Sequence, residues 1–425
     1  MDQKVYRACV SVLHEELIPA FGCTEPIAVA YAAAKARQVL GIFPERMTAE
    51  CSGNIIKNVQ GVIVPTTGDL RGIAAAALLG VVGGDPERKL EVLTTVTPEH
   101  VERVRQLMKQ GVCREKMLNT PAKLHIIIRM EQGEHSSMVE MIHSHTNIVR
   151  IEKDGEALLD IPHEVQEVET KNHNYEYLSV ANIVDFANEV KADDVKDVLD
   201  QQISNNTAIS KAGLQEPYGA RVGATLLKLY GDSDVKIRAK AFAAAGSDAR
   251  MSGCEMPVVI NSGSGNQGMT VSLPVIEYAK EMKVDREKLY RALCLSNLIA
   301  IYQKTKIGKL SAYCGAVNAA VGAGAGICWL CGGCLKEIEQ VIVNTIGNVS
   351  GIVCDGAKPA CAAKIASSVD AAIMAVGMAM DNHGFHAGEG IIKENIEDTL
   401  ESMGQLAREG MRQTDLELLN IMVPQ

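Results

Sequence analysis

The sequence is poor in aromatic residues and has no lysine- or arginine-rich run. Aromatic side chains make up 4% of the 425 residues and hydrophobic residues 47%, so alanine, glycine and aliphatic side chains must fill the core. Small side chains let helices approach closely, which favours a compact, Ala-rich helical domain. The net charge of −10 and the lack of a basic patch argue against nucleic acid as a partner.

An apolar leader and an aliphatic membrane-spanning run are also missing. The first ten residues, MDQKVYRACV, are charged and then amphipathic, so a cytoplasmic protein is expected. The 26 residues from 310 to 335 carry no charge and are long enough to span a bilayer. They are mostly Gly, Ala, Cys and Ser, which favours a buried core element over a lipid-facing helix. No membrane is therefore expected as a partner.

The pattern of hydrophobic residues predicts an α+β protein. Residues 1–170 are expected to form a mixed α/β domain, and residues 171–425 a mostly helical, Ala/Gly-rich domain, with the boundary in the polar segment 163–178. Strands are predicted at 47–53, 61–67, 90–96, 123–130 and 136–152. Helices are predicted at 3–18, 24–41, 70–83 and 98–111, with Thr24 capping the second, and then throughout the second domain.

The segment VVINSGSGNQGMT spaces Gly263, Gly265 and Gly268 as G-x-G-x-x-G. A dinucleotide site would need this motif between a strand and a helix in a strand–helix–strand unit, and the surroundings here are helical. A loop whose N–H groups bind a small anion, such as a substrate carboxylate, is the better interpretation. A simple tight turn between helices remains as good an explanation.

Twelve cysteines in a chain without a leader indicate free thiols or metal ligands rather than disulfides. Cys23, in AFGCTEP, precedes a predicted helix whose N-terminus would stabilise a thiolate, whereas Glu25 would oppose it. Cys354 and Cys361 are separated by Gly356 and Pro359, so a loop can return both sulfurs to one centre, with Cys314 as a third ligand. On spacing alone, packing cysteines remain an alternative for all of these.

The most conspicuous cysteine motif is CWLCGGC, in which Cys328, Cys331 and Cys334 are spaced as in ferredoxins. The fourth cysteine followed by proline is missing, and on one continuous helix Cys328 and Cys334 would point about 120° apart. Cysteines that only pack in the protein interior are therefore favoured here over cluster ligands. Among histidines, neither pair forms a helical zinc motif, so solvated or hydrogen-bonded side chains are expected, and the Gly-rich setting of the second pair makes it a candidate for lining a pocket. The two pairs are His143 with His145 and His383 with His386.

The motifs FGCTEP, SGSGNQG, AYCGA and CDGAKPAC together resemble the L-cysteine desulfidase family, which is related to the α region of iron–sulfur L-serine dehydratases. The resemblance covers nearly the whole chain. It implies a [4Fe–4S] lyase that converts L-cysteine and water to pyruvate, ammonia and hydrogen sulfide. It also implies that Cys314, Cys354 and Cys361 hold the cluster, that Cys23 is the base, and that Ser262 and Asn266 contact the substrate.

Three alternatives remain at this stage. An L-serine dehydratase would use the same mechanism with a hydroxyl leaving group. A redox-sensing cluster protein would bind the cluster without turnover, and a zinc protein would use the cysteines structurally. The expected partner is a small amino-acid substrate, and a homo-oligomer is left open.

Overall fold

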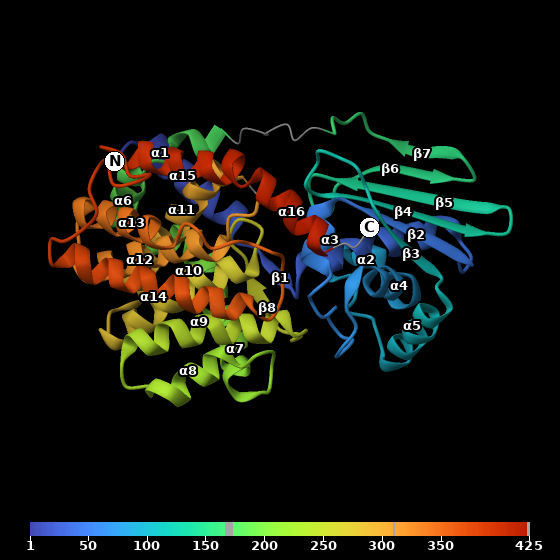
Figure 1. The fold of residues 1–425 in the computed structure, drawn as a ribbon, viewed down its shortest axis with the longest axis horizontal. Coiled ribbons are helices and arrows are strands. Elements are labelled where there is room, and N and C mark those ends of the chain that lie inside the picture. The colour runs from blue at the N-terminus through green and yellow to red at the C-terminus, as the bar shows by residue number, and fades with distance from the viewer. Residues whose placement is uncertain (166–172, 309–310, 423–425) are drawn as a thin grey trace.

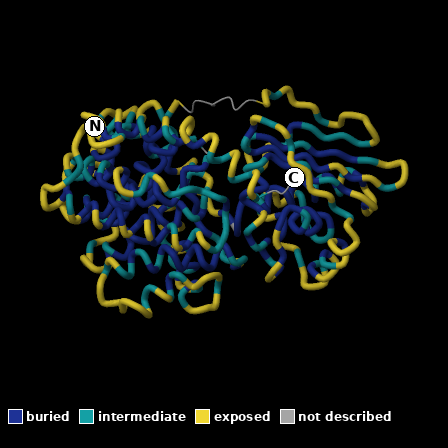
Figure 2. Tube along the Cα trace, viewed as in Figure 1, coloured by how far each residue is buried: buried dark blue, intermediate teal, exposed yellow. Residues whose placement is uncertain are grey.

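The computed structural model describes residues 1–165, 173–308 and 311–422, and it confirms the predicted α+β fold. A six-stranded sheet with its helices lies beside a body made almost entirely of helices (Figure 1). Buried chain fills the interior of each part (Figure 2). Two separate large hydrophobic clusters account for these interiors, one within residues 27–141 and the other mostly within the C-terminal half.

The sheet has the strand order β3-β2-β4-β5-β6-β7, and only the β2–β3 pair is parallel. Its strands are β2 (Arg46–Cys51), β3 (Cys113–Met117), β4 (His125–Gln132), β5 (His135–Ile142), β6 (Ile148–Lys153) and β7 (Glu156–Asp160). Ile126, Ile128 and Met130 alternate along β4 and are fully buried, whereas Arg129 is exposed. This period of two fixes which face of the sheet meets the helices.

Helices α2 (Thr24–Leu40) and α4 (Gly72–Gly83) cover that face, and α5 (Pro98–Gln110) packs on α4. The short helix α3 (Gly53–Val59) follows β2 directly. Predicted strands at 61–67 and 90–96 are wrong. The first is an irregular segment with one isolated bridge, between Ile63 and Arg71, and the second begins in the 3₁₀ helix η1 (Pro86–Glu91).

The helical part includes the first residues of the chain as well as the C-terminal half. Apolar side chains of α1 (Gln3–Glu16) share one cluster with the C-terminal helices, and β1 (Pro19–Phe21) pairs with β8 (Pro257–Val259). The first domain was expected to begin at residue 1, so this packing differs from that expectation. The predicted boundary at 170/171 falls outside the described residues and stays a prediction.

The remaining helices are α6 (Val180–Glu189), α7 (Lys196–Gln215), α8 (Val222–Tyr230), α9 (Val235–Met251), α10 (Gly265–Glu281), α11 (Arg286–Ile307), α12 (Gly315–Leu330), α13 (Leu335–Val349), α14 (Cys361–Met380) and α15 (Ile396–Gln405). Short 3₁₀ segments lie at η2 (His173–Tyr177) and η3 (Ala192–Asp194), and a π turn, η4 (Leu406–Gly410), follows α15.

Close helix contacts explain the small residues of the uncharged run. Helix α12 packs against α10, α11, α13 and α14, and nearly all of its residues are buried. A Cβ on Gly322 would lie 2.4 Å from the carbonyl oxygen of Ser296 in α11, so only glycine allows this approach. Helix α14 is the one described helix long and apolar enough to cross a membrane, with 56% of its apolar window buried in this fold. Buried core helices have the same composition.

The last helix, α16 (Arg412–Met422), returns from the helical part to the α/β part (Figure 1). Asp415 forms an ion pair with Lys57 of α3, whose side chain is 2% exposed. Leu419 packs directly over Gly53, at the start of the same helix. Because a buried lysine needs a partner, this pair ties the end of the described chain to the α/β part.

Candidate active site

A cavity of about 410 Å³ lies where the two parts of the molecule meet, and four helices begin at its wall. Cys23 precedes α2, Ser264 precedes α10, Cys314 precedes α12, and Cys361 is the first residue of α14. All four residues line the cavity. Helix N-termini carry partial positive charge and unpaired N–H groups. Their convergence therefore favours anions, such as thiolates or a carboxylate, in this cavity.

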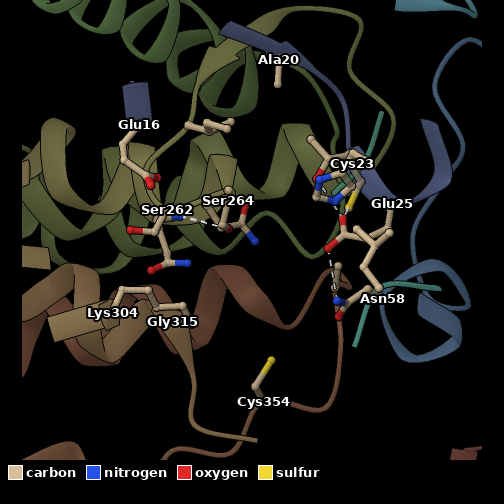
Figure 3. Close-up of a pocket in the computed structure, with 18 of the residues that line it drawn as sticks. Glu16, Ala20, Cys23, Glu25, Asn58, Ser262, Ser264, Lys304, Gly315 and Cys354 are labelled. Carbon is tan, nitrogen blue, oxygen red and sulfur yellow. Dashed lines mark hydrogen bonds between the residues drawn. The ribbon is translucent and has the colours of Figure 1, made fainter. Parts of the chain in front are cut away.

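Cys23 lies at the N-terminus of α2, as the sequence predicted, but Cys23 itself and not Thr24 is the N-cap. Its thiol donates a hydrogen bond to Oε2 of Glu25 at 3.2 Å, and Asn58 donates to the other carboxylate oxygen at 3.2 Å (Figure 3). Burial and the charge of Glu25 raise the pKa of Cys23 far above its ordinary value, against a smaller opposing effect of Arg250. Cys23 is therefore a thiol whose proton already has an acceptor.

Cys314 and Cys354 are brought together by two extended segments. Tyr313 and Val353 form an antiparallel bridge, supported by hydrogen bonds from Cys314 N to Ile352 O and from Cys354 N to Ala312 O. The residues that follow the two bridged positions lie on the same face of such a pair. Cys314 and Cys354 therefore face the same side, and the Cys354 thiol points into the cavity (Figure 3).

Cys361 reaches the same cavity because no helix continues from Cys354 to Cys361, in agreement with the predicted loop. Asp355 holds this loop through ion pairs with Lys358 and Lys364, which outweigh its burial and lower its pKa to about 2. Lys364 also donates to the carbonyl of Val353 at 2.7 Å. These contacts fix the loop and place the ammonium groups of Lys358 and Lys364 near the Cys361 thiol.

The three cysteines have the donor chemistry of an iron–sulfur site. Burial raises the pKa of Cys314 to about 12, and burial also raises that of Cys361, so metal binding would have to displace their protons. Within the described ranges, no three His, Cys, Asp or Glu side chains meet as ligands of a single ion. Ligands of a cluster bind different iron atoms and surround the cluster instead. The spread of these cysteines around a cavity is compatible with that arrangement.

Ser262 and Asn266 also line the cavity, on the loop and first turn that lead into α10. The β1–β8 ribbon forms this wall, with Cys23 beyond the end of β1 and Ser262 beyond the end of β8 (Figure 3). Ser262 has a φ of +50°, which turns the chain sharply into the helix. β8 pairs only with β1, and antiparallel, so the loop is not part of a dinucleotide-binding strand–helix–strand unit.

Cysteines of the CWLCGGC motif lie elsewhere and do not line this cavity. Cys328 is buried in α12, Cys331 ends that helix, and Cys334 caps α13. The second pair, His383 and His386, does not line this cavity, whereas His143 and His145 do.

Sequence reasoning missed three buried cations of the cavity wall: Lys57, which is paired with Asp415, and Arg250 and Lys304. Arg250 is 3% exposed and Lys304 7% exposed. Burial lowers the pKa of Lys304 to about 8, although Cys354 and Cys314 partly oppose this. The available signal was a single charge on an otherwise apolar helix face, as in SDARMSG of α9.

The model of the serine dehydratase alpha chain family matches residues 87–420. The chain belongs to this family. The matched range contains Cys314, Cys354 and Cys361 but begins after Cys23. The family is generally iron–sulfur dependent, and membership implies a lyase-type enzyme.

Several relatives are similar over almost their full length. A UPF0597 protein of Lachnoclostridium phytofermentans is 57% identical over 419 residues, which cover 99% of this chain and 100% of the relative. UPF0597 proteins of Desulfitobacterium hafniense and Treponema denticola are 48% and 45% identical, each over 100% of this chain and 98% and 99% of the relative.

Proposed function

We propose that the protein is a [4Fe–4S]-dependent lyase that converts L-cysteine and water to pyruvate, ammonia and hydrogen sulfide. The observation that carries this proposal is the meeting of Cys23 with Cys314, Cys354 and Cys361 in one cavity, although they come from three separate segments of the chain. The cavity also offers positive charge for an amino-acid carboxylate. The motif resemblance favours cysteine as the substrate.

Cys314, Cys354 and Cys361 would hold the cluster. With three protein ligands, one iron would stay open and supply Lewis acidity toward the leaving sulfur. Lys304 and Lys364 lie close enough to Cys314 and Cys354 to interact with their charge, so they would offset the negative charge of the bound thiolates.

Cys23 would take the α-proton of the substrate. Because Cys23 is a thiol, its Sγ proton has to pass to Oε2 of Glu25, which already accepts the hydrogen bond, as Sγ takes the proton from Cα. The electron pair of the Cα–H bond becomes the Cα=Cβ bond, and the Cβ–S bond breaks with its pair on sulfur. The proton held on Glu25 then leaves with the sulfide. The aminoacrylate product hydrolyses in water to pyruvate and ammonia.

L-Serine is a second candidate substrate, favoured by the family match. The same proton path applies, with hydroxide in place of sulfide as the leaving group. Anaerobically reconstituted protein should release sulfide and pyruvate from L-cysteine faster than pyruvate from L-serine. The reverse order would make the protein a serine dehydratase.

A Cys23→Ser variant separates the enzyme from a cluster-binding sensor. The variant should keep the visible absorption of the iron–sulfur cluster and lose turnover, because a hydroxyl is a far weaker proton acceptor at neutral pH. No turnover of either amino acid by the wild type would overturn the proposal.

A further inference from the structure

Arg250 is a buried cation without an acidic partner. Its side chain lines the cavity and is 3% exposed, and it forms no ion pair among the described residues. Its one side-chain hydrogen bond there runs from Nη1 to Oδ1 of Asn266 at 3.4 Å, and its buried Nε has no partner. A guanidinium has five N–H donors and is costly to bury without an anion. Arg250 is therefore an anion-binding group at the cavity for which the described part of the chain supplies no paired carboxylate.

The packing of Arg250 strengthens this conclusion. A Cβ on Gly265 would lie 2.4 Å from Nε and 2.8 Å from Cζ, so the guanidinium rests on the first residue of α10. A cation is unfavourable beside the positive end of a helix unless an anion lies between them. The guanidinium and the N-terminus of this 17-residue helix thus favour the same kind of ligand at the same place.

Cys23 lies close enough to Arg250 for the positive charge of the guanidinium to act on the thiol. In an α-amino acid, the carbon that loses its proton is bonded directly to the carboxylate carbon. A carboxylate held by Arg250 would therefore bring the Cα–H group toward the Cys23 thiol. Of the other buried cations of the cavity, Lys57 is paired with Asp415, and Lys304 interacts instead with Cys354 and Cys314, on the side of the proposed cluster ligands.

We propose that Arg250, with Asn266 and the N-terminus of α10, binds the α-carboxylate of the substrate and so restricts the enzyme to amino acids with a free carboxylate. This inference rests on the proposed function for the identity of the substrate, but not for its test. Arginine suits this role because its planar fork pairs with both oxygens of a carboxylate.

The test measures binding without turnover, by calorimetry on anaerobically reconstituted protein. The probe is L-alanine, which has no leaving group, and the matched control is L-alaninamide, which lacks the carboxylate charge. The wild type should prefer L-alanine, and Arg250→Gln should bind it roughly 10- to 100-fold more weakly, the range for a charge-assisted hydrogen bond. The same variant should bind L-alaninamide nearly as the wild type does.

Further variants keep the test decisive if Arg250→Gln folds poorly. Gly265→Ala displaces the guanidinium without removing it and should weaken L-alanine binding selectively, and Arg250→Lys should restore part of the preference. If Lys304→Gln, and not Arg250→Gln, loses the preference, or if the wild type binds no L-alanine, the inference is overturned. Lyase turnover is measured separately. Selective binding without turnover would contradict the proposed function alone, and turnover with an unchanged preference in Arg250→Gln would contradict this inference alone.

Discussion

The Glu25→Gln variant tests whether the base is Cys23 alone or Cys23 with Glu25. Glutamine keeps the size of the side chain and can still accept from Asn58, but it cannot take the Sγ proton. The thiol is buried, and its pKa lies far above neutrality, so almost no thiolate exists near pH 7 without an acceptor. General base catalysis contributes about 10²–10⁴-fold to a rate, so kcat should fall by that factor, or about 3–5 kcal/mol in the barrier.

The pH dependence separates a loss of proton transfer from a loss of structure. In Glu25→Gln, hydroxide has to deprotonate Cys23, so the residual kcat should rise about tenfold per pH unit above neutrality. The wild type should not show this slope, because Glu25 accepts the proton directly. Steady-state sulfide release between pH 6.5 and 9 measures both profiles.

Thr24→Val provides the matched control. It removes the other hydrogen bond to Oε2 of Glu25, which is 3.1 Å long, and leaves the path from Cys23 intact. This variant should change kcat by much less than Glu25→Gln. The reasoning would be refuted if both variants lost the same activity, or if Glu25→Gln kept the pH profile of the wild type with its cluster absorption intact.

Three further predictions concern the ligands, the backbone and the pH dependence of stability. Cys354→Ala should lose iron on anaerobic reconstitution, measured by the iron-to-protein ratio, whereas Cys331→Ala should retain it; the opposite result would mean that the ligands were chosen wrongly. Gly22→Ala should lower kcat with little loss of iron, because the residue has a φ of +58° and a Cβ would lie 2.3 Å from Pro65 Cγ; unchanged turnover would show that this turn does not position Cys23. Burial raises the pKa of Asp248 to about 6, above an unfolded value of about 3.9, so this group stabilises the fold at low pH and loses that contribution as pH rises through 6. Relative to wild type, Asp248→Asn should therefore be about 1.4 kcal/mol more favourable at pH 8 than at pH 5 in urea unfolding, and a difference independent of pH would contradict the assignment.

Periodic segments were predictable because a single packing face determines them. The strand predicted at 123–130 and the helix predicted at 98–111 match β4 and α5 to within two residues. The apolar segment 61–67 failed because burial does not require a strand: Val62 and Val64 are fully buried in an irregular segment. In 90–96, Val92 and Leu93 are buried beside a 3₁₀ turn that Asp85 and Pro86 begin. An apolar run of this length does not show whether the segment is a buried strand or a buried irregular or helical segment.

The cavity was predictable only in part, and its cysteines were easier to find than its cations. Cys314, Cys354 and Cys361 were singled out by the resemblance of their motifs to a known family, and the fold places all three on one cavity. Arg250 and Lys304 resemble ordinary surface charges in the sequence. Their importance comes from burial, which depends on helices far away in the chain. The local signal, one charge on an otherwise apolar helix face, does not by itself show that the side chain is buried.

The position of Cys23 shows why the site depends on both parts of the molecule. The chain leaves the helical part at β1, which pairs with β8, and enters the core of the α/β part with α2. Gly22 and Cys23 form this crossing, and the Cys23 side chain packs in a small cluster with Val62, Met251 and Cys361. Proton removal at Cα and departure of the leaving group from Cβ take place on adjacent carbons, so the base and the Lewis acid have to lie at a fixed separation around one substrate molecule. Because the proposed base lies at the crossing and the proposed cluster ligands lie in the helical part, packing of the two parts would set that separation.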